Sequence, residues 1–425
     1  MFNAKFQYFA KDDSPIPGSQ VCKINSFTID MKHLKFKADY LFTGEQMLNK
    51  DFVLITNEMG VVENIIPSSE AGSGVQVLEG ILSPGFINCH CHLELSHLKN
   101  LIPEKTGLVD FVYKVVTHRQ ADEEIILDAI ARAEDEMIEN GIVAVGDICN
   151  NTDSFLQKQK QRIAYYNFIE VSGWLPGIAE ARFEKSKSYF DMFSQISSSK
   201  NQLSMVPHAP YSVSDELWQL IQPFFSQKTA TIHNQETAFE DEFFFSGTGD
   251  FLRMFAAMNI DNRFFKPTGK SSLQSYLYKL GNAKNVLFVH NTFTKRQDIQ
   301  FVKKQWNNNP AAFYCICANA NIYIENSLAP IELLISENLN IVLGTDSLAS
   351  NHSLSILDEM KTIIRHFPKI SHVQLLQWAT INGAKALQVS STLGSFEAGK
   401  TPGVILIKNN DDQRLTQQSS ITTIV

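Results

Sequence analysis

The chain has 425 residues, of which 44% are hydrophobic, enough for one large core and a smaller second unit. Its formal net charge of −8, without a basic cluster, argues against binding to a nucleic-acid backbone. No apolar run approaches the ~20 residues of a membrane span, the first residues lack a secretory signal, and six cysteines are too few for a disulfide framework. We therefore expect a cytoplasmic protein whose partner is a small molecule, not a nucleic acid or a membrane.

The first part of the chain, up to residue 82, predicts a small β-domain. Short stretches of alternating hydrophobicity are separated by turns that contain glycine, proline and asparagine. The expected strands are residues 26–30, 34–40, 52–56, 61–66 and 74–79.

From residue 83 to residue 394 the pattern changes to strands that alternate with helices, which indicates a parallel α/β fold. The expected strands are residues 86–91, 143–148, 163–171, 203–207, 230–233, 286–290, 312–317 and 341–344. The clearest helices are expected at residues 122–140, 354–366 and 371–387. Eight strand–helix units over roughly 300 residues predict a (β/α)8 TIM barrel.

A strand pattern returns near the end of the chain, at residues 403–407. We expect residues 395–425 to rejoin residues 1–82. The two ends of the chain would then build a small β-sandwich domain next to the barrel.

The first barrel strand carries the most informative motif, Ser-Pro-Gly-Phe-Ile-Asn-Cys-His-Cys-His at residues 83–92. Alternate side chains of a strand share a face, so His90 and His92 can reach one point, and two converging imidazoles suggest a metal. Cys89 and Cys91 would face the opposite side, which argues against a zinc knuckle. For this pair alone, a chance spacing stays an alternative.

Chemistry in such a barrel lies at the carboxyl ends of the strands. Five of the eight expected strands end in a histidine or an aspartate: His90 and His92, His208, His233 (followed by Glu236), His290, and Asp346. Each residue alone could be a capped core histidine or a turn aspartate. Together the five strand ends indicate one site.

These residues, in this order and spacing, resemble the amidohydrolase superfamily, in its aminohydrolase branch of deaminases and chlorohydrolases. The similarity extends from Pro-Gly-Phe-Ile-Asn at residues 84–88 to Gly-Lys-Thr-Pro-Gly at residues 399–403. The resemblance implies that one divalent metal is bound by His90, His92, His233 and Asp346. We expect zinc, although iron and manganese accept the same ligands. No lysine follows the fourth strand, where binuclear members carry one.

The resemblance also implies roles in catalysis. Glu236 matches the acid that transfers protons, and His290 matches the histidine that orients the attacking hydroxide. Asp346 is both a ligand and the acceptor of the water proton. Metal sites lower the pKa of water from ~15.7 towards ~7. The expected reaction is attack on a ring carbon that bears an amino group, followed by loss of ammonia.

Candidate residues for substrate binding are His208, which matches a substrate-contacting histidine of nucleoside deaminases, and Glu94 and Ser96 after the histidine motif. A structural salt bridge is an equal alternative for Glu94. The phenylalanine-rich segment 239–265 is either a wall of the substrate pocket or part of the core.

The motifs at residues 90–98 and 106–111 are most similar to aminodeoxyfutalosine deaminases, which act on an adenine nucleoside in a menaquinone route. Methylthioadenosine/S-adenosylhomocysteine deaminases are also similar. We therefore expect a homodimeric hydrolase of carbon–nitrogen bonds in cyclic amidines. The alternatives are deamination of guanine or cytosine, hydrolysis of a cyclic amide or a heteroaromatic chloride, and an inactive barrel that only binds partners.

Overall fold

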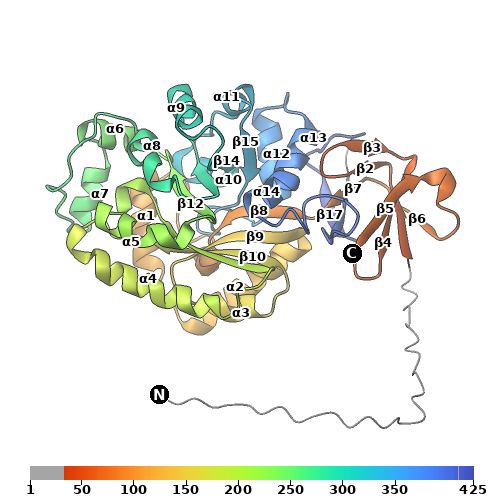
Figure 1. The fold of residues 1–425 in the computed structure, drawn as a ribbon, viewed down its shortest axis with the longest axis horizontal. Helices are drawn as coiled ribbons and strands as arrows, with labels where there is room; N and C mark the ends of the chain where they lie inside the picture. The colour runs from red at the N-terminus through yellow and green to blue at the C-terminus, as the bar shows by residue number, and fades with distance from the viewer. Residues whose placement is uncertain (1–32, 410) are drawn as a thin grey trace, which may run out of the picture. The chain divides into compact units, whose positions relative to one another are not determined.

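The computed structural model describes residues 33–409 and 411–425, and His33–Val425 form one compact unit (Figure 1). The strand expected at residues 26–30 lies outside the described residues. The division of the chain after residues 82 and 394 stays a prediction.

Eight parallel strands form two four-stranded sheets, with the orders β11-β10-β9-β8 and β12-β13-β14-β15. The strands are β8 (Phe86–Cys91), β9 (Ile142–Cys149), β10 (Ala164–Val171), β11 (Asn201–Pro207), β12 (Thr229–Asn234), β13 (Asn285–His290), β14 (Ala311–Ile316) and β15 (Asn340–Leu343). Most of their residues are buried, as in parallel sheets that are covered on both faces. All eight expected strands are confirmed to within two residues.

Hydrogen bonds connect the two sheets at the carboxyl ends of their outer strands. The main-chain N–H of His233, in β12, donates to the carbonyl oxygen of His208, after β11, at 3.0 Å. Thr345 and Asp346, after β15, both donate to the carbonyl oxygen of His90 in β8, each at 3.0 Å. The polar residues that follow these strands are therefore brought close together.

Helices connect the parallel strands and surround them in Figure 1. They are α1 (Leu108–His118), α2 (Glu123–Glu139), α3 (Phe155–Gln159), α4 (Ala179–Ser194), α5 (Asp215–Phe225), α6 (Ala238–Ser246), α7 (Phe251–Ala257), α8 (Ser272–Tyr276), α9 (Arg296–Trp306), α10 (Ala318–Glu325), α11 (Ile331–Ser336), α12 (Ile356–His366), α13 (His372–Ala379) and α14 (Ile381–Ala386). Short 3-10 helices are η1 (Ser68–Glu70), η2 (Leu93–Leu98), η3 (Pro176–Ile178), η4 (Pro210–Ser212) and η5 (Leu277–Leu280). In the described part of the chain, no helix has the length and apolar character needed to cross a membrane.

Two of the three expected helices are confirmed, as α2 and α12. The prediction of one helix over residues 371–387 was wrong, because the chain breaks at Thr380 between α13 and α14. The hydroxyl of Thr380 donates to the carbonyl oxygen of Leu376 at 2.6 Å, and its backbone has φ −129° and ψ −93°. Such a side-chain bond to the preceding turn competes with regular helical hydrogen bonding.

Two smaller sheets contain the remaining strands. One has the order β5-β4-β1-β6 and the other the order β17-β16-β7-β2-β3. The strands are β1 (His33–Lys37), β2 (Tyr40–Phe42), β3 (Met47–Asn49), β4 (Phe52–Asn57), β5 (Val62–Pro67), β6 (Val75–Val77), β7 (Ile81–Pro84), β16 (Val404–Lys408) and β17 (Ser420–Thr423). Because β16 pairs with β7, residues from the two ends of the sequence share a sheet.

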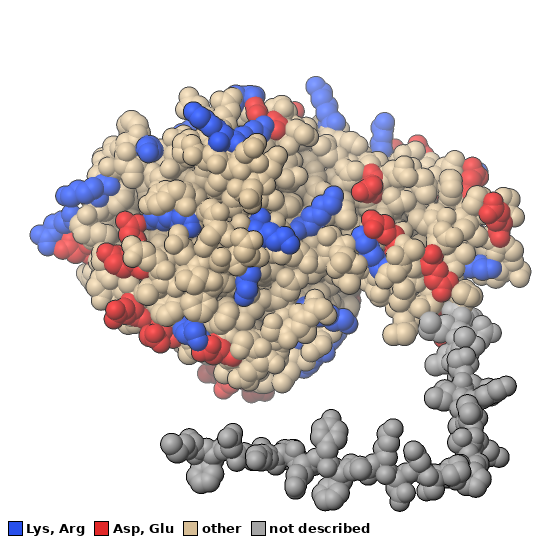
Figure 2. Space-filling model, viewed as in Figure 1, with Lys and Arg blue, Asp and Glu red and all other residues tan. Residues whose placement is uncertain are grey.

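The expected single strand at residues 34–40 was wrong, since β1 and β2 belong to different sheets. Between them the carboxylate of Asp39 accepts the N–H of Gly80 at 2.8 Å, so the chain turns from one sheet to the other here. On the face shown in Figure 2, acidic and basic side chains are interspersed among neutral ones.

Candidate active site

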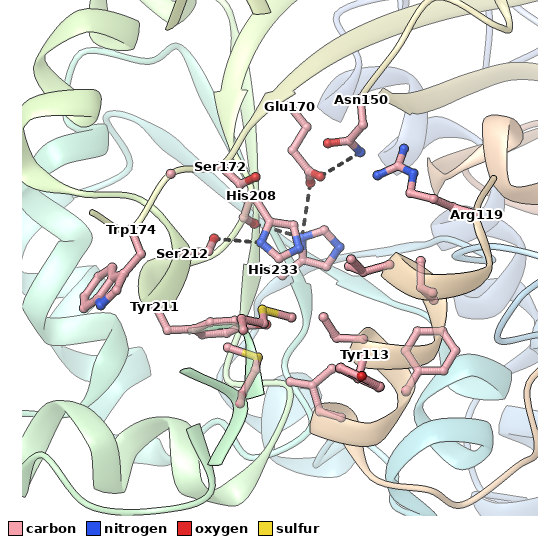
Figure 3. A pocket seen from close by; sticks show the side chains of 18 of the residues that line it. Tyr113, Arg119, Asn150, Glu170, Ser172, Trp174, His208, Tyr211, Ser212 and His233 are labelled. Carbon is pink, nitrogen blue, oxygen red and sulfur yellow. Dashed lines mark hydrogen bonds and ion pairs between the residues drawn. The ribbon is translucent and has the colours of Figure 1, made fainter. Parts of the chain in front are cut away.

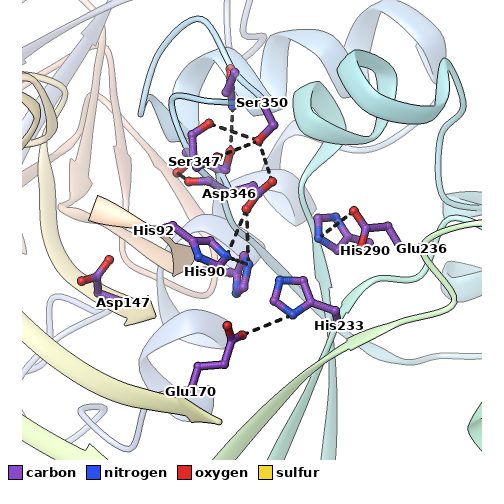
Figure 4. Close-up of polar contacts among 12 residues, drawn as sticks. His90, His92, Asp147, Glu170, His233, Glu236, His290, Asp346, Ser347 and Ser350 are labelled. Carbon is purple, nitrogen blue, oxygen red and sulfur yellow. Dashed lines mark hydrogen bonds and ion pairs between the residues drawn. The ribbon is translucent and has the colours of Figure 1, made fainter. Parts of the chain in front are cut away.

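Four buried residues meet at the carboxyl ends of the parallel strands (Figure 4). His90 and His92 come from the end of β8, His233 lies near the end of β12, and Asp346 follows β15. One ligand atom of each lies within 4.8 Å of those of the other three. The structure thus brings together the four residues that the sequence proposed as metal ligands.

The spacing of these atoms fits a single ion. Nε2 of His92 is 3.1 Å from Nε2 of His90. Oδ1 of Asp346 is 3.3 Å from Nε2 of His92 and 3.6 Å from Nε2 of His90. Tetrahedral ligands about 2.1 Å from a metal are about 3.4 Å apart. Several lone pairs that converge this closely are best satisfied by a cation.

The protonation of the histidines also suits a metal, which binds the neutral imidazole. Burial lowers the pKa of His92 to about 3 and holds the pKa of His233 well below its ordinary value. Nδ1 of His233 donates to the carbonyl oxygen of His208 at 2.8 Å, because a carbonyl can only accept. This bond leaves Nε2 of His233 as the unprotonated nitrogen.

Four residues at the site have an uncommon backbone conformation. Gln235, His290, Asn291 and Asp346 have positive φ angles of 45°, 71°, 56° and 57°. Residues other than glycine rarely adopt this left-handed conformation, and such strain concentrates at functional sites. At Asp346 the conformation turns the chain back towards His90, whose carbonyl oxygen accepts the Asp346 N–H.

Glu236 and His290 lie next to the four candidate ligands (Figure 4). Oε1 of Glu236 is 3.5 Å from Nε2 of His290, and both side chains are buried. Burial raises the pKa of the Glu236 carboxyl well above its usual range, so this group can hold a proton for transfer. Burial also lowers the pKa of His290 and favours its neutral form.

A cavity of about 760 Å³ opens beside these residues (Figure 3). Its polar end is lined by His92, His208, His233, Glu236, His290 and Asp346. Its apolar walls come from α1 and from α7 with the residues after it: Leu108, Phe111, Val112, Val115, Met254, Phe255, Met258 and Ile260. Within the phenylalanine-rich segment, Phe243 and Phe251 are buried core residues, whereas Phe255 lines the cavity.

The two candidates after the histidine motif differ in position. Glu94 lines the cavity, but Oε1 accepts from Arg119 at 3.2 Å and Oε2 accepts from the N–H groups of Asn150 and Asn151 at 2.9 and 3.1 Å. Ser96 is not among the lining residues, and its hydroxyl donates to the carbonyl oxygen of Leu93 at 2.7 Å within η2.

His208 lies where the sequence placed it, on the wall of the cavity beside His233. Nδ1 of His208 donates to the hydroxyl oxygen of Ser212 at 2.7 Å, and that hydroxyl donates to the carbonyl oxygen of Ala209 at 3.0 Å. Burial lowers the pKa of His208 to about 4. The neutral ring therefore keeps Nε2 as a hydrogen-bond acceptor.

Three further residues were missed or left open by the sequence. Ser350 donates to Oδ2 of Asp346 at 2.6 Å, and Asn321 accepts from Nδ1 of His290 at 2.8 Å. Glu170 lines the cavity at the end of the third parallel strand, β10. Its position at a strand end was the signal that could have found it.

The chain is similar to known proteins over most of its length. A sequence model of the amidohydrolase family matches residues 81–424. The 5-methylthioadenosine/S-adenosylhomocysteine deaminase of Teredinibacter turnerae is 27% identical over 388 residues, which cover 86% of this chain and 81% of that protein.

Two solved structures share the fold. Aminofutalosine deaminase of Helicobacter pylori, in complex with methylthio-coformycin, has a TM-score of 0.75 and 22% identity, covering 90% of this chain and 93% of that one. A zinc-bound adenosine deaminase from Xanthomonas campestris has a TM-score of 0.68 and 19% identity. The match covers 88% of this chain and 84% of that one. At these identities the likeness shows a common fold, of TIM-barrel type.

Proposed function

The chain belongs to the amidohydrolase family, and we propose that it is a metal-dependent aminohydrolase that releases ammonia from an amino-substituted heteroaromatic ring. The observation that carries the proposal is the convergence of four candidate ligands beside a buried, protonatable Glu236 at one end of a cavity. The related proteins named above are deaminases, hydrolases that act on carbon–nitrogen bonds in cyclic amidines.

A divalent metal bound by His90, His92, His233 and Asp346 would supply hydroxide at neutral pH by lowering the pKa of water. We propose zinc, because histidine and carboxylate donors with near-tetrahedral spacing suit it. Iron and manganese are the alternatives that metal analysis of the purified protein distinguishes.

The protein's own residues carry the protons. Asp346 turns Oδ1 towards the histidines and has Oδ2 held by Ser350, so its carboxylate is fixed where it can take the proton of the attacking water. Glu236 delivers a proton to the ring nitrogen next to the reacting carbon. His290 directs Nε2 towards the same region and accepts a hydrogen bond from the attacking water.

We propose an adenine-type nucleoside as the substrate, with an apolar group attached at the 5′ position. The cavity extends beyond the polar end along apolar side chains of α1 and α7, which leaves room for a sugar and its substituent. Burying such a substituent would contribute ~1.5–3 kcal/mol. Aminodeoxyfutalosine, methylthioadenosine and 5′-deoxyadenosine are the candidates of this kind.

The test is ammonia release by the metal-loaded protein from one panel under one set of conditions. The panel contains these three nucleosides, adenosine, guanine, cytosine, a chlorotriazine and a cyclic amide. The proposal predicts the highest kcat/KM for a nucleoside with an apolar 5′ group. Preference for a free base would overturn the nucleoside assignment, and reaction of only the chlorotriazine or the cyclic amide would overturn deamination.

We also infer that the two parallel sheets close into one (β/α)8 barrel and that the two smaller sheets pack as a β-sandwich. The hydrogen bonds that join β12 to the end of β11, and β8 to the end of β15, support the barrel. A homodimer in the cytoplasm is the assembly we propose, and light scattering of the purified protein tests its mass.

A further inference from the structure

The cavity contains a buried carboxylate that the proposed mechanism does not use. Glu170, near the end of β10, is 5% exposed and lines the cavity. Figure 3 shows its side chain between Asn150 and His233, on the side of the cavity opposite the apolar residues of α1.

The two oxygens of Glu170 have different surroundings. Oε2 accepts a hydrogen bond from Nδ2 of Asn150 at 3.0 Å. Oε1 is buried and has no hydrogen-bond partner among the residues that the structure describes. Nδ1 of His233 is 3.5 Å away, but its hydrogen is directed to the carbonyl oxygen of His208 at 2.8 Å. A buried acceptor of this kind needs a donor, which a bound ligand can supply.

Glu94, the carboxylate that the sequence suggested for substrate binding, lacks this freedom. Both of its oxygens accept from protein groups, namely Arg119 and the N–H groups of Asn150 and Asn151. Asn150 joins the two acids, since its main chain donates to Glu94 and its side chain donates to Glu170. Glu94 therefore supports the wall, whereas Glu170 presents a free acceptor.

A second acceptor lies beside Glu170. Because Ser212 takes the Nδ1 hydrogen of His208, Nε2 of His208 is left to accept a hydrogen bond. A ring nitrogen of His208, a carboxylate oxygen of Glu170 and a ring nitrogen of His233 lie within 4.8 Å of one another. His233 has a hydrogen on Nδ1, and its Nε2 is already a candidate ligand of the first metal, so only Glu170 and His208 would remain for a second ion. This group suits a ligand with two neighbouring donors.

We propose that Glu170 accepts hydrogen bonds from the sugar hydroxyls of the substrate, with His208 as the neighbouring acceptor, and that it makes the enzyme prefer ribonucleosides to deoxyribonucleosides. This inference rests on the proposed function, because a nucleoside provides a vicinal diol next to its base. A site that offers acceptors to hydroxyl groups rejects analogues that lack those groups.

The experiment compares Glu170→Gln with the wild-type enzyme on adenosine and on 2′,3′-dideoxyadenosine. The wild type is expected to prefer adenosine by about 10- to 100-fold in kcat/KM, because the dideoxy analogue would leave a buried acceptor without its donor. In Glu170→Gln, kcat/KM for adenosine should fall by about the same factor, while that for the dideoxy analogue changes by less than about threefold. Calorimetric binding of inosine and 2′,3′-dideoxyinosine should show the same pattern without turnover.

Glu94→Gln is the matched comparison on the same wall. Because both oxygens of Glu94 already accept hydrogen bonds from protein groups, this variant should lower kcat/KM for both substrates by the same factor. It should also lower the melting temperature. Equal losses for adenosine and the dideoxy analogue in Glu170→Gln would overturn the inference and leave nucleoside deamination intact. If the wild type deaminates a free base but no nucleoside, the nucleoside assignment on which this inference rests fails as well, so the two failures are distinguishable.

Discussion

Asn321, near the start of α10, makes two hydrogen bonds with His290, one to its main chain and one to its imidazole ring. Nδ2 of Asn321 donates to the carbonyl oxygen of His290 at 3.3 Å, and Oδ1 accepts from Nδ1 of the ring at 2.8 Å. The first bond fixes which end of the carboxamide faces the ring. Nδ1 of His290 therefore carries the hydrogen, and Nε2, which points towards Glu236, is the acceptor.

Replacing Asn321 should affect turnover more than binding. In Asn321→Leu the ring loses the partner that fixes its orientation, and residues in such supporting positions typically contribute ~10–100-fold. We expect kcat to fall by about this factor, with metal content unchanged and KM altered by less than about threefold. Asn319→Ala, on the same helix, is the control, because its side chain accepts from Thr362 instead of His290. An equal loss of kcat in the control would contradict the role of Asn321.

Metal removal should abolish activity and lower stability together. Dialysis against a chelator is expected to reduce the melting temperature, because an ion that binds only the folded state stabilises it. Returning zinc should restore both properties, and His233→Ala should keep little metal in elemental analysis. Full ammonia release by protein stripped of metal would exclude the proposed mechanism.

Glu236→Gln separates proton transfer from metal binding. The amide keeps the shape of the side chain but cannot deliver a proton, so kcat should fall ~10²–10⁴-fold while metal content stays normal. Glu242→Gln is the control, because Glu242 lies on the exposed side of α6 and accepts from Thr248. Turnover near that of the wild type in Glu236→Gln would remove this residue from the mechanism.

The sequence predicted the eight parallel strands well because each is buried on both faces and so appears as a short apolar run. The candidate metal ligands were predictable for a related reason, since they lie at the carboxyl ends of those strands or within three residues after them. Ser96 was proposed as a substrate contact because it closely follows the histidine motif. After His92 the chain enters the 3-10 helix η2, in which side chains repeat their direction about every three residues instead of every two, as in a strand. Ser96 therefore faces the carbonyl oxygen of Leu93.

Residues that act through distant partners could not be predicted in this way. Asn321 contacts a histidine 31 positions earlier in the sequence. The position of Glu170 near a strand end was visible in the sequence, but the lack of a partner for its Oε1 among the described residues depends on the arrangement of several loops. No local pattern in one sequence contains that information.

A buried ion pair supports the loop that carries His92. Nζ of Lys158 is 2.5 Å from Oδ2 of Asp147, and both side chains are fully buried. Oδ1 of Asp147 accepts the N–H of Leu93 at 2.8 Å, directly after His92.

Breaking this ion pair should be costly. In Lys158→Met, Asp147 would remain as an unpaired buried carboxylate, and the free energy of unfolding is expected to fall by ~3–5 kcal/mol in urea. Adding Asp147→Asn should recover part of the loss, because the uncompensated charge is removed. If the two single losses simply added in the double variant, the two residues would not be coupled as the structure indicates.

The stability of the metal-free protein should depend on pH partly through Glu240. This side chain is fully buried in α6 and accepts the N–H groups of Gln235 and Glu236 at 3.0 and 3.3 Å. Burial raises its pKa to about 8, against about 4.3 in an unfolded chain. Between these values the folded state keeps a proton that the unfolded state has lost. The stabilisation from this group is therefore complete below pH ~4.3 and is lost as the pH rises through about 8.

Glu240→Gln removes this titration. The variant should be less stable at pH 5, because the amide cannot accept both N–H groups as the carboxyl does. Its deficit relative to the wild type should shrink between pH 5 and pH 8.5, by an amount on the order of 1–4 kcal/mol. Urea unfolding of both proteins at the two pH values measures this change, and the pH dependence of the active-site histidines cancels because both proteins share it. A deficit that stays constant or grows with pH would mean that Glu240 is already ionised in the folded protein.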